Sequence, residues 1–175
     1  MTAYSKKADQ HVEHLEKKIK RALEYGISLN PKKCQFGVTE GKLLGHIVSR
    51  EGVRIDPKRV MAIDKIPLPK NVKEIQSFFG KINFIRRFIT IFSEITRPIS
   101  NMLKKGSKVE WNEEALKAFI GIKKTIKEAP VLKSPNYNKP MQIFYFASFH
   151  TIVVVLLQKN DEGFEQPISF FSKSL

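Results

Sequence analysis

The chain has 175 residues, of which 42% are hydrophobic and 10% aromatic, so it is long enough for one ordinary domain or two small ones and is not of disordered composition. Its longest apolar run, Ile152 to Leu157, is far shorter than the roughly 20 residues that cross a bilayer, which excludes a membrane-embedded function. The polar start MTAYSKKADQ predicts no secretory signal, and the single cysteine, Cys34, excludes an internal disulfide. We expect an intracellular chain, cytoplasmic or nuclear, with no membrane partner.

The net charge of +14 is unevenly spread along the chain. Residues 1–110 hold 23 Lys and Arg against 11 Asp and Glu, whereas residues 111–175 hold 8 against 6. A surface this basic attracts polyanions and releases their counterions on binding, so a nucleic acid duplex is the first partner to expect. The alternative is that the excess charge only keeps helix faces soluble.

The first part of the chain predicts a helix followed by a β-hairpin. Apolar residues recur at helical spacing over Asp9 to Tyr25. Strand-like runs at Gln35 to Val38 and Leu43 to Ser49 predict a hairpin, with Gly45 as a point of close backbone approach and Gly52 as a closing turn.

The middle of the chain predicts a helical hairpin with a basic face. Asp56 precedes a proline and predicts the start of a short helix, and Asn71 with Glu74 resembles a capping box that starts the next one. Ser93 is the cap candidate of the third helix. Apolar residues form one stripe of the helix from Asn71, namely Val72, Ile75, Phe78, Phe79, Ile82, Ile85 and Ile89. The opposite face carries Lys73, Lys81, Arg86 and Arg87.

The last part predicts one more helix and then a sheet. Asn112 can cap a helix that ends before Pro130. Short β-branched and aromatic runs at Met141 to Phe146, Ile152 to Gln158 and Pro167 to Phe171 predict three antiparallel strands in a meander.

Residues with metal-binding or nucleophilic chemistry are few. His11 and His14 share a helix face at a spacing that suits a metal ion, but no third ligand is apparent, so we interpret them as surface histidines. Cys34 lies between cations without a His or Asn partner, which favours a packed thiol over a nucleophile. The chain has four aspartates, and none is paired for two-metal chemistry by its position.

Several separate stretches resemble the reverse transcriptases of Ty3/gypsy-type retrotransposons. They are LNPKKCQFG at Leu29 to Gly37, LLGHIVSREGVRIDPKRV at Leu43 to Val60, FFGKINFIRRFI, and WNEEALKAF, and they occur in the order of that family. The resemblance covers essentially the whole chain, and a set of motifs in order is more specific than one short match.

The resemblance implies an α+β chain in three parts. Residues 1–55 would be the end of the palm, whose hairpin at Leu44, Gly45, His46 and Ile47 resembles the primer grip. Residues 56–110 would be a small helical thumb bundle that holds the template-primer duplex, with contacts from Lys58, Arg59, Lys73, Lys81, Arg86 and Arg87. Residues 111–175 would be the connection helix and a partial, three-stranded, RNase H-like sheet.

The resemblance also implies that the catalytic carboxylates are missing. The Tyr-x-Asp-Asp strand of the family is expected just before the residues that match the start of this chain. The Thr-Asp-Ala-Ser motif of the RNase H domain aligns with Tyr145 to Ser148, so Phe146 replaces its first metal-binding Asp. The parent family uses Mg²⁺, but we expect no catalytic residue, no metal site and no cofactor here.

Three functions remain open from the sequence. The leading one is a catalytically inactive retroelement fragment that keeps a surface for duplex nucleic acid. The second is a piece of a longer, active RNA-directed DNA polymerase polyprotein. The third is a reused interaction or structural protein. The resemblance to the RNase H fold further implies an unpaired edge at Gln142 to Phe146, which predicts self-association.

Overall fold

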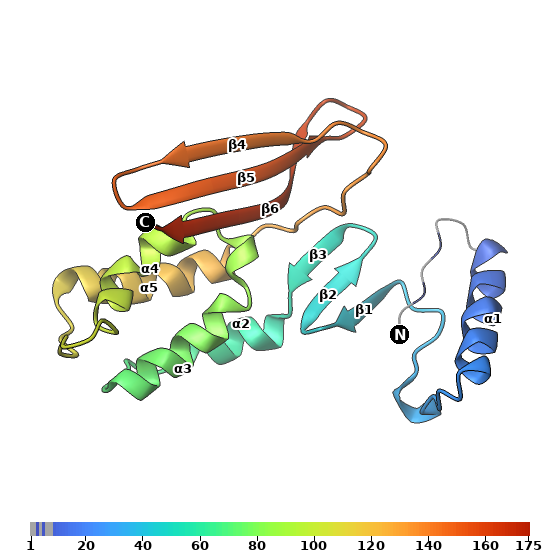
Figure 1. Ribbon diagram of the computed structural model, residues 1–175, viewed down its shortest axis with the longest axis horizontal. Coiled ribbons are helices and arrows are strands. Elements are labelled where there is room, and N and C mark those ends of the chain that lie inside the picture. Colours follow the sequence, from blue (N-terminus) through green and yellow to red (C-terminus); the bar gives the residue numbers. More distant parts are fainter. Residues whose placement is uncertain (1–2, 4, 6–8) are drawn as a thin grey trace. The chain divides into compact units, whose positions relative to one another are not determined.

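A computed structural model describes Ala3, Ser5 and residues 9–175, and it divides the chain into two compact units, residues 1–38 and 39–175 (Figure 1). The first unit contains helix α1 (Asp9–Glu24) and the short 3-10 turn η1 (Pro31–Lys33). Gly26, with a φ of 65°, follows α1, and the Ile27 N–H donates to the carbonyl oxygen of Ala22. A glycine in this conformation is a common way to end a helix.

The second unit begins with a three-stranded antiparallel sheet, in which β1 (Glu40–Leu43), β2 (His46–Ser49) and β3 (Gly52–Ile55) are neighbours in that order. The predicted strand at Gln35 to Val38 was wrong, because those residues have no strand partner and the first strand starts at Glu40. Gly52 is not a closing turn but the first residue of β3, paired with Ser49.

Helices α2 (Pro57–Asp64) and α3 (Val72–Asn83) begin where their caps predicted. The Asp56 carboxylate accepts from the N–H of Lys58 at 3.0 Å, and the Asn71 side chain accepts from the N–H of Glu74 at 2.9 Å. Each bond satisfies a backbone N–H that the first helical turn leaves without a partner.

The apolar stripe that starts in α3 continues past the end of the helix. Ile85 and Ile89 are fully buried, but α3 ends at Asn83 and the 3-10 turn η2 (Arg86–Phe88) follows. Helix α4 (Phe92–Asn101) then begins without a side-chain cap from its own segment, so the predicted cap at Ser93 was wrong.

Helix α5 (Glu113–Lys127) starts at the predicted cap, where Asn112 accepts from the N–H of Ala115 at 2.8 Å. It packs against α4 and α2, and its buried face joins one hydrophobic core with the other helices. The largest fully buried side chains of that core include Phe78, Phe88, Ile99, Ile122 and Leu132.

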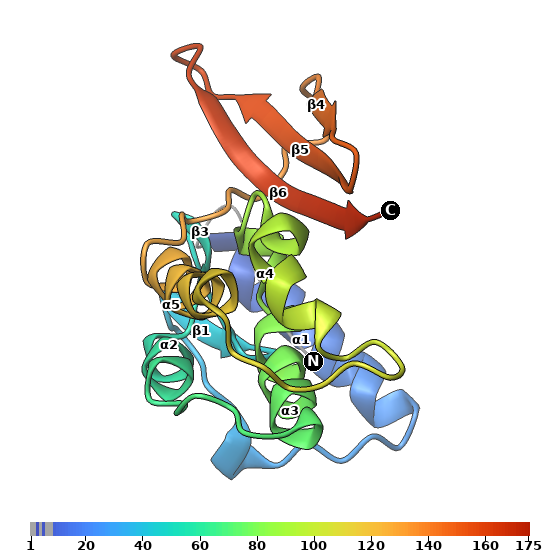
Figure 2. The same cartoon turned by 90° about the vertical axis from the view of Figure 1, so that its left-hand side faces the viewer.

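The chain closes with the predicted antiparallel meander of β4 (Gln142–Ala147), β5 (Thr151–Lys159) and β6 (Glu165–Ser174). Among the described residues β4 pairs only with β5, so it is an edge strand. Strand β6 forms the other edge and is the strand nearest to α4 and η2 (Figures 1 and 2).

The segment after α5 connects the two sheets. Leu132 exchanges two backbone hydrogen bonds with Val53 of β3, at 2.7 and 2.9 Å, and the N–H of Lys133 donates to the carbonyl of Pro167 in β6. Gly52 is required here because a Cβ at this position would lie 2.2 Å from the Leu132 carbonyl oxygen.

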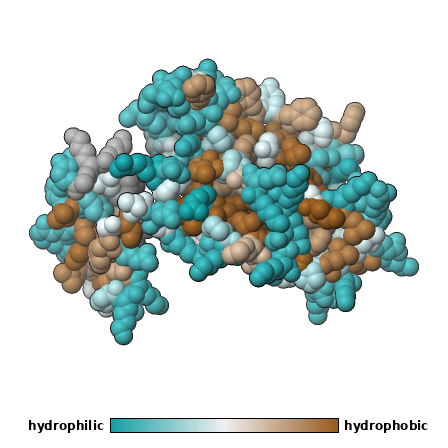
Figure 3. Space-filling view, turned by 180° about the vertical axis from the view of Figure 1, so that it is seen from behind, coloured by the Kyte–Doolittle hydropathy of each residue, from teal (hydrophilic) through white to brown (hydrophobic). Residues whose placement is uncertain are grey.

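The predicted α+β fold class is confirmed by this arrangement. Its division into parts at residues 55 and 110 stays a prediction, and the core includes Ile55 as well as Phe119. None of the described helices is long and apolar enough to cross a membrane. The face in Figure 3 shows apolar patches between hydrophilic ones, in keeping with the many exposed apolar side chains.

Candidate nucleic-acid interface

The turn between β1 and β2 brings the primer-grip-like residues to the surface of α2 and α3. Leu44 and Gly45 both have positive φ, 48° and 78°, and Leu44 is exposed. A Cβ on Gly45 would lie 2.9 Å from a guanidinium nitrogen of Arg59 and 3.0 Å from the ring of Phe84. The prediction that Gly45 is a point of close approach is therefore confirmed.

Behind this turn, aromatic rings and cations stack on one another. The His46 ring lies on the Phe84 ring with centroids 4.6 Å apart and 17° between planes, and the Phe88 ring is 5.3 Å away. The Arg59 guanidinium also lies over Phe84, 4.1 Å from its centroid. We call Gly45, His46, Arg59, Phe84 and Arg87 the hairpin cluster.

Burial lowers the pKa of His46, and the nearby charges of Arg87 and then Arg59 lower it further. Its Nδ1 atom is buried without a hydrogen-bond partner in the described part of the chain. Burial and the neighbouring cations thus disfavour the protonated form of His46, and an anion beside those arginines would offset their effect.

Several of the predicted contact residues are exposed cations. Lys58 lies in the first turn of α2, Lys73 and Lys81 on α3, and Arg87 on η2. Lys73, Lys81 and Arg87 have no salt bridge to any residue that the structure describes. Arg87 lies 6.0 Å from the centroid of the Phe88 ring, but such a contact leaves its charge unneutralised. Cations without an ion-pair partner are available to phosphate groups.

Arg86 differs from its neighbour, because it is half-buried and committed to the sheet. Its guanidinium donates to the carbonyl oxygen of Ser172 on β6 and lies 5.4 Å from the Phe171 ring centroid. The prediction that Arg86 lies on the open face of a helix was wrong, since the helix ends before it.

The same part of β6 also holds the start of α4. The Ser172 hydroxyl accepts from the N–H of Ser93 at 2.9 Å, and so supplies the cap that α4 lacks locally. The buried Thr151 hydroxyl donates to the Glu94 carboxylate at 2.5 Å. These bonds attach the sheet to the segment that carries Arg87.

Three of the four aspartates are held in ion pairs with lysines. The Asp56 carboxylate is paired with Lys42, Asp64 with Lys127 and Asp161 with Lys139. Hydrogen bonds from these lysines hold the pKa of each of the three carboxyls below its usual value. No group of three His, Cys, Asp or Glu that could bind a metal ion occurs among the described residues.

The residue that the resemblance aligns with the first RNase H Asp is Phe146, and it is exposed on β4. An aromatic ring does not coordinate Mg²⁺, so the residues present do not fit the metal of the parent family.

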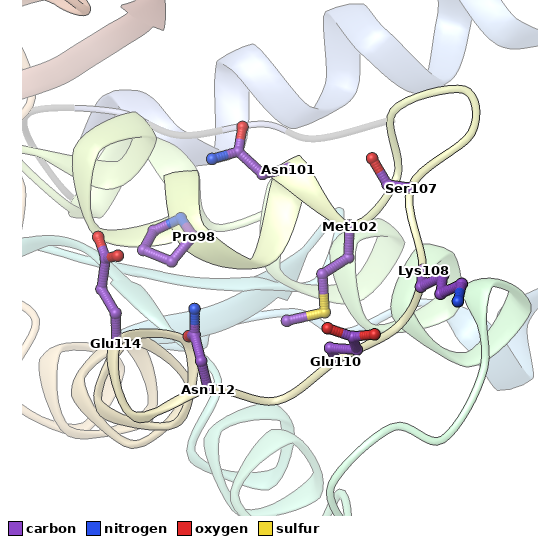
Figure 4. A pocket seen from close by; sticks show the side chains of 8 residues that line it. All are labelled: Pro98, Asn101, Met102, Ser107, Lys108, Glu110, Asn112 and Glu114. Atoms are coloured by element: carbon purple, nitrogen blue, oxygen red, sulfur yellow. The ribbon is translucent and has the colours of Figure 1, made fainter.

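A shallow hollow lies between the end of α4 and the start of α5, and it contains two carboxylates (Figure 4). Glu110 lies near Met102, whereas Glu114 lies on the opposite side of the hollow near Pro98. The two are not paired for general acid and base chemistry.

The histidines and the cysteine of the first unit have local contacts. The rings of His11 and His14 are on one side of α1, where both Nδ1 atoms are hydrogen-bonded to the Ser5 hydroxyl, at 3.2 and 2.7 Å. Cys34 is half-buried, and its N–H closes the turn η1 by donating to the Pro31 carbonyl.

Sequence reasoning missed Phe84, Ser172 and Thr151. Phe84 follows the apolar stripe of α3 out of register by one position, which was the available signal that it faces elsewhere. Ser172 and Thr151 are buried hydroxyls in strands, and only their tertiary partners show what they do.

Comparison with known proteins shows what this chain is similar to. Residues 111–175 match the family described as "RNase H-like domain found in reverse transcriptase". The transposon Tf2-3 and Tf2-4 polyproteins of Schizosaccharomyces pombe are each 28% identical over 172 residues, which is 98% of this chain and 13% of each polyprotein.

Solved structures of a reverse transcriptase are also similar to this chain. The foamy viral protease-reverse transcriptase in complex with an RNA/DNA hybrid has a TM-score of 0.84 and 26% identity, over 98% of this chain and 23% of that one. The same enzyme in complex with double-stranded DNA has a TM-score of 0.82 and 26% identity, over 98% and 36%. The resemblance drawn from the motifs is therefore confirmed: the chain is similar to transposon polyproteins and to a protease-reverse transcriptase, and its residues 111–175 match the RNase H-like domain found in reverse transcriptases.

Proposed function

We propose that this chain is a retrotransposon-derived reverse transcriptase and RNase H fragment that binds duplex nucleic acid and is catalytically inactive by itself. The observation that carries the proposal is the set of unpaired cations, Lys73, Lys81 and Arg87, in the same unit as the hairpin cluster. The solved relatives were bound to an RNA/DNA hybrid and to double-stranded DNA, which supports the same class of partner here.

The binding would be through phosphates and would be tolerant of sequence. Lysine and arginine side chains contact the backbone of a duplex, which positions the protein but carries no base preference. Three phosphate contacts give a salt slope of about −2.7, so a fourfold rise in salt lowers the affinity by about 40-fold.

Fluorescence anisotropy with a labelled duplex at two salt concentrations tests this proposal. Replacing Lys73, Lys81 and Arg87 together by Gln is expected to weaken binding and flatten the salt dependence. A matched control removes the same charge from ion-paired lysines, by substituting Gln at Lys117, Lys127 and Lys139. Equal losses in the two triple variants, or a wild-type affinity that ignores salt, would refute the proposed surface.

The inactivity has its own test. Asp56, Asp64 and Asp161 are each paired with a lysine, the described residues contain no group of three His, Cys, Asp or Glu that could bind a metal ion, and the resemblance aligns Phe146 with a metal-binding Asp. We expect the purified chain to cleave no RNA in an RNA·DNA hybrid with Mg²⁺ or Mn²⁺. Cleavage that a chelator abolishes would disprove this, whereas an active longer polyprotein would not.

The open edge of β4 supports a second partner, another copy of the chain. This strand contains no charged residue and no proline, and Ile143 to Phe146 are exposed. Unprotected edges of this kind pair with other chains. An interaction protein that has reused the fold would show this association without salt-dependent binding of a duplex.

A further inference from the structure

A groove separates η2 from the outer edge of β6. It is lined by Arg86, Arg87, Ser169, Phe170 and Phe171, with no acidic residue among them. Both walls belong to the same compact unit. The groove shares Arg87 with the hairpin cluster, whereas the cations of α3 do not line it.

The bond from Arg86 to the Ser172 carbonyl fixes the wall that η2 forms. The Arg86 guanidinium also lies between two rings, 5.8 Å from the centroid of Phe92 and 5.4 Å from that of Phe171. Because the Arg86 side chain is held by this hydrogen bond and by contacts with two rings, the spacing between Arg87 and β6 is fixed before any ligand binds. A preorganised site avoids part of the ordering cost of binding.

The opposite residues are free to bind. In the part of the chain that the structure describes, neither the Arg87 guanidinium nor the Ser169 hydroxyl has a hydrogen-bond partner. Phe171 is 49% exposed, although Arg86 contacts its ring. A cationic hydrogen-bond donor, a hydroxyl and an exposed aromatic ring thus line one groove.

This combination fits one nucleotide of a single strand. A guanidinium and a hydroxyl bind a phosphate, and an exposed aromatic ring stacks a base. A base inside a duplex is already stacked and paired, so the ring contributes only where a base is unpaired. A peptide strand added to the β6 edge would not use the two arginines unless it were acidic.

We propose that this groove binds an unpaired nucleotide at the single-stranded overhang of a bound duplex, with its phosphate at Arg87 and Ser169 and its base on Phe171. The proposal rests on the duplex binding proposed above and adds a preference for overhangs. It predicts that the chain distinguishes a duplex with an overhang from a blunt one of equal length.

The test measures the affinity of the full chain for a blunt duplex and for the same duplex with a 5′ or a 3′ overhang of several nucleotides. One base stacked on an aromatic ring supplies about fivefold or more in affinity. We expect at least one overhang to be bound about fivefold more tightly than the blunt duplex by the wild type.

Phe171→Leu is expected to remove this preference and leave the affinity for the blunt duplex unchanged. Phe164→Leu is the matched control, because Phe164 is 66% exposed in the turn before β6 and does not line the groove. Ser169→Ala removes a hydroxyl with no internal partner, and it tests the groove even if Phe171→Leu fails to fold.

Equal wild-type affinity for blunt and overhanging duplexes would overturn the groove proposal and leave the proposed function standing. Equal losses in Phe171→Leu and Phe164→Leu, or an unchanged preference in Ser169→Ala together with Phe171→Leu, would overturn it as well. If no duplex binds, the proposed function fails and this proposal fails with it. An acidic peptide that binds the groove and an overhang that does not would assign the site to a protein partner and refute the proposal.

Discussion

Adjacent arginines in η2 should respond to substitution in opposite ways. Arg86 donates to the carbonyl of Ser172, which is 1% exposed, whereas Arg87 is exposed and has no such bond. Arg86→Ala is therefore expected to destabilise the fold, and Arg87→Ala to weaken the binding of duplex.

The magnitudes follow from these environments. A hydrogen bond from a charged donor contributes about 1.5–3 kcal/mol, and because Arg86 is only half-buried we expect a loss of about 1.5–2 kcal/mol in the free energy of unfolding. Arg87→Ala should change that free energy by no more than about 0.5 kcal/mol. It should reduce the salt slope of duplex binding by about 1, as the loss of one phosphate contact does.

Urea denaturation followed by the fluorescence of Trp111 measures the first effect. Trp111 is the single tryptophan of the chain, and its indole N–H donates to the Pro69 carbonyl at 2.7 Å, so its signal reports the packing of the helices. If Arg87→Ala destabilised the chain as much as Arg86→Ala does, the assignment of the two side chains would be incorrect. Loss of binding in Arg86→Ala at full stability would contradict it too.

Other predictions concern the backbone, a histidine and the sheet edge. Gly52→Ala should lower the free energy of unfolding by about 3–5 kcal/mol, because its Cβ would displace the carbonyl of Leu132 and break two hydrogen bonds at a strained φ of 135°. Gly163→Ala is the control: its φ is 87° and the space around it is open, so it should lower that free energy by about 1 kcal/mol. Thermal melting measures both. Since the pKa of His46 is depressed in the fold, the unfolded chain alone takes up this proton as pH falls below about 6.5, so stability should decline there. His46→Phe should remove that decline. Urea denaturation at pH 7.5 and pH 5.5 measures the free energy of unfolding of both proteins, and an equal difference between variant and wild type at the two pH values would exclude a contribution from His46. Tyr145→Lys, at a β4 residue that is 83% exposed, should convert a self-associating chain into a monomer by sedimentation, and a wild type that stays monomeric at high concentration would disprove the edge argument.

The helix starts were predictable from the sequence because their caps are local. Asp56, Asn71 and Asn112 each accept an N–H from within three residues, so the spacing in the sequence is the geometry of the bond. The three strands of the last sheet were predictable for a similar reason, since β-branched runs between turn residues mark them without knowledge of their partners.

The first hairpin was misplaced because its turn lacks the usual residues. Leu44 has a positive φ of 48°, a conformation that a leucine sequence does not suggest. The role of Gly52 was misread for a different reason. What requires a glycine there is the backbone of Leu132, about eighty positions away in the chain, and no local pattern contains it.

The different environments of Arg86 and Arg87 could not be predicted from the sequence. Arg86 and Arg87 have the same charge, are neighbours and follow the same apolar stripe, so composition and periodicity assign them one role. The end of α3 at Asn83 turns them to different sides: one meets the carbonyl of Ser172 and the other lines the groove without a bond of its own. Since the partner of Arg86 lies on β6, the last sheet determines which of the two guanidiniums remains without a hydrogen-bond partner in the described part of the chain. A substitution at Ser172 that shifted β6 would therefore change the proposed binding although no contact residue is replaced. If the helices alone formed the surface, such a substitution would have no effect on binding.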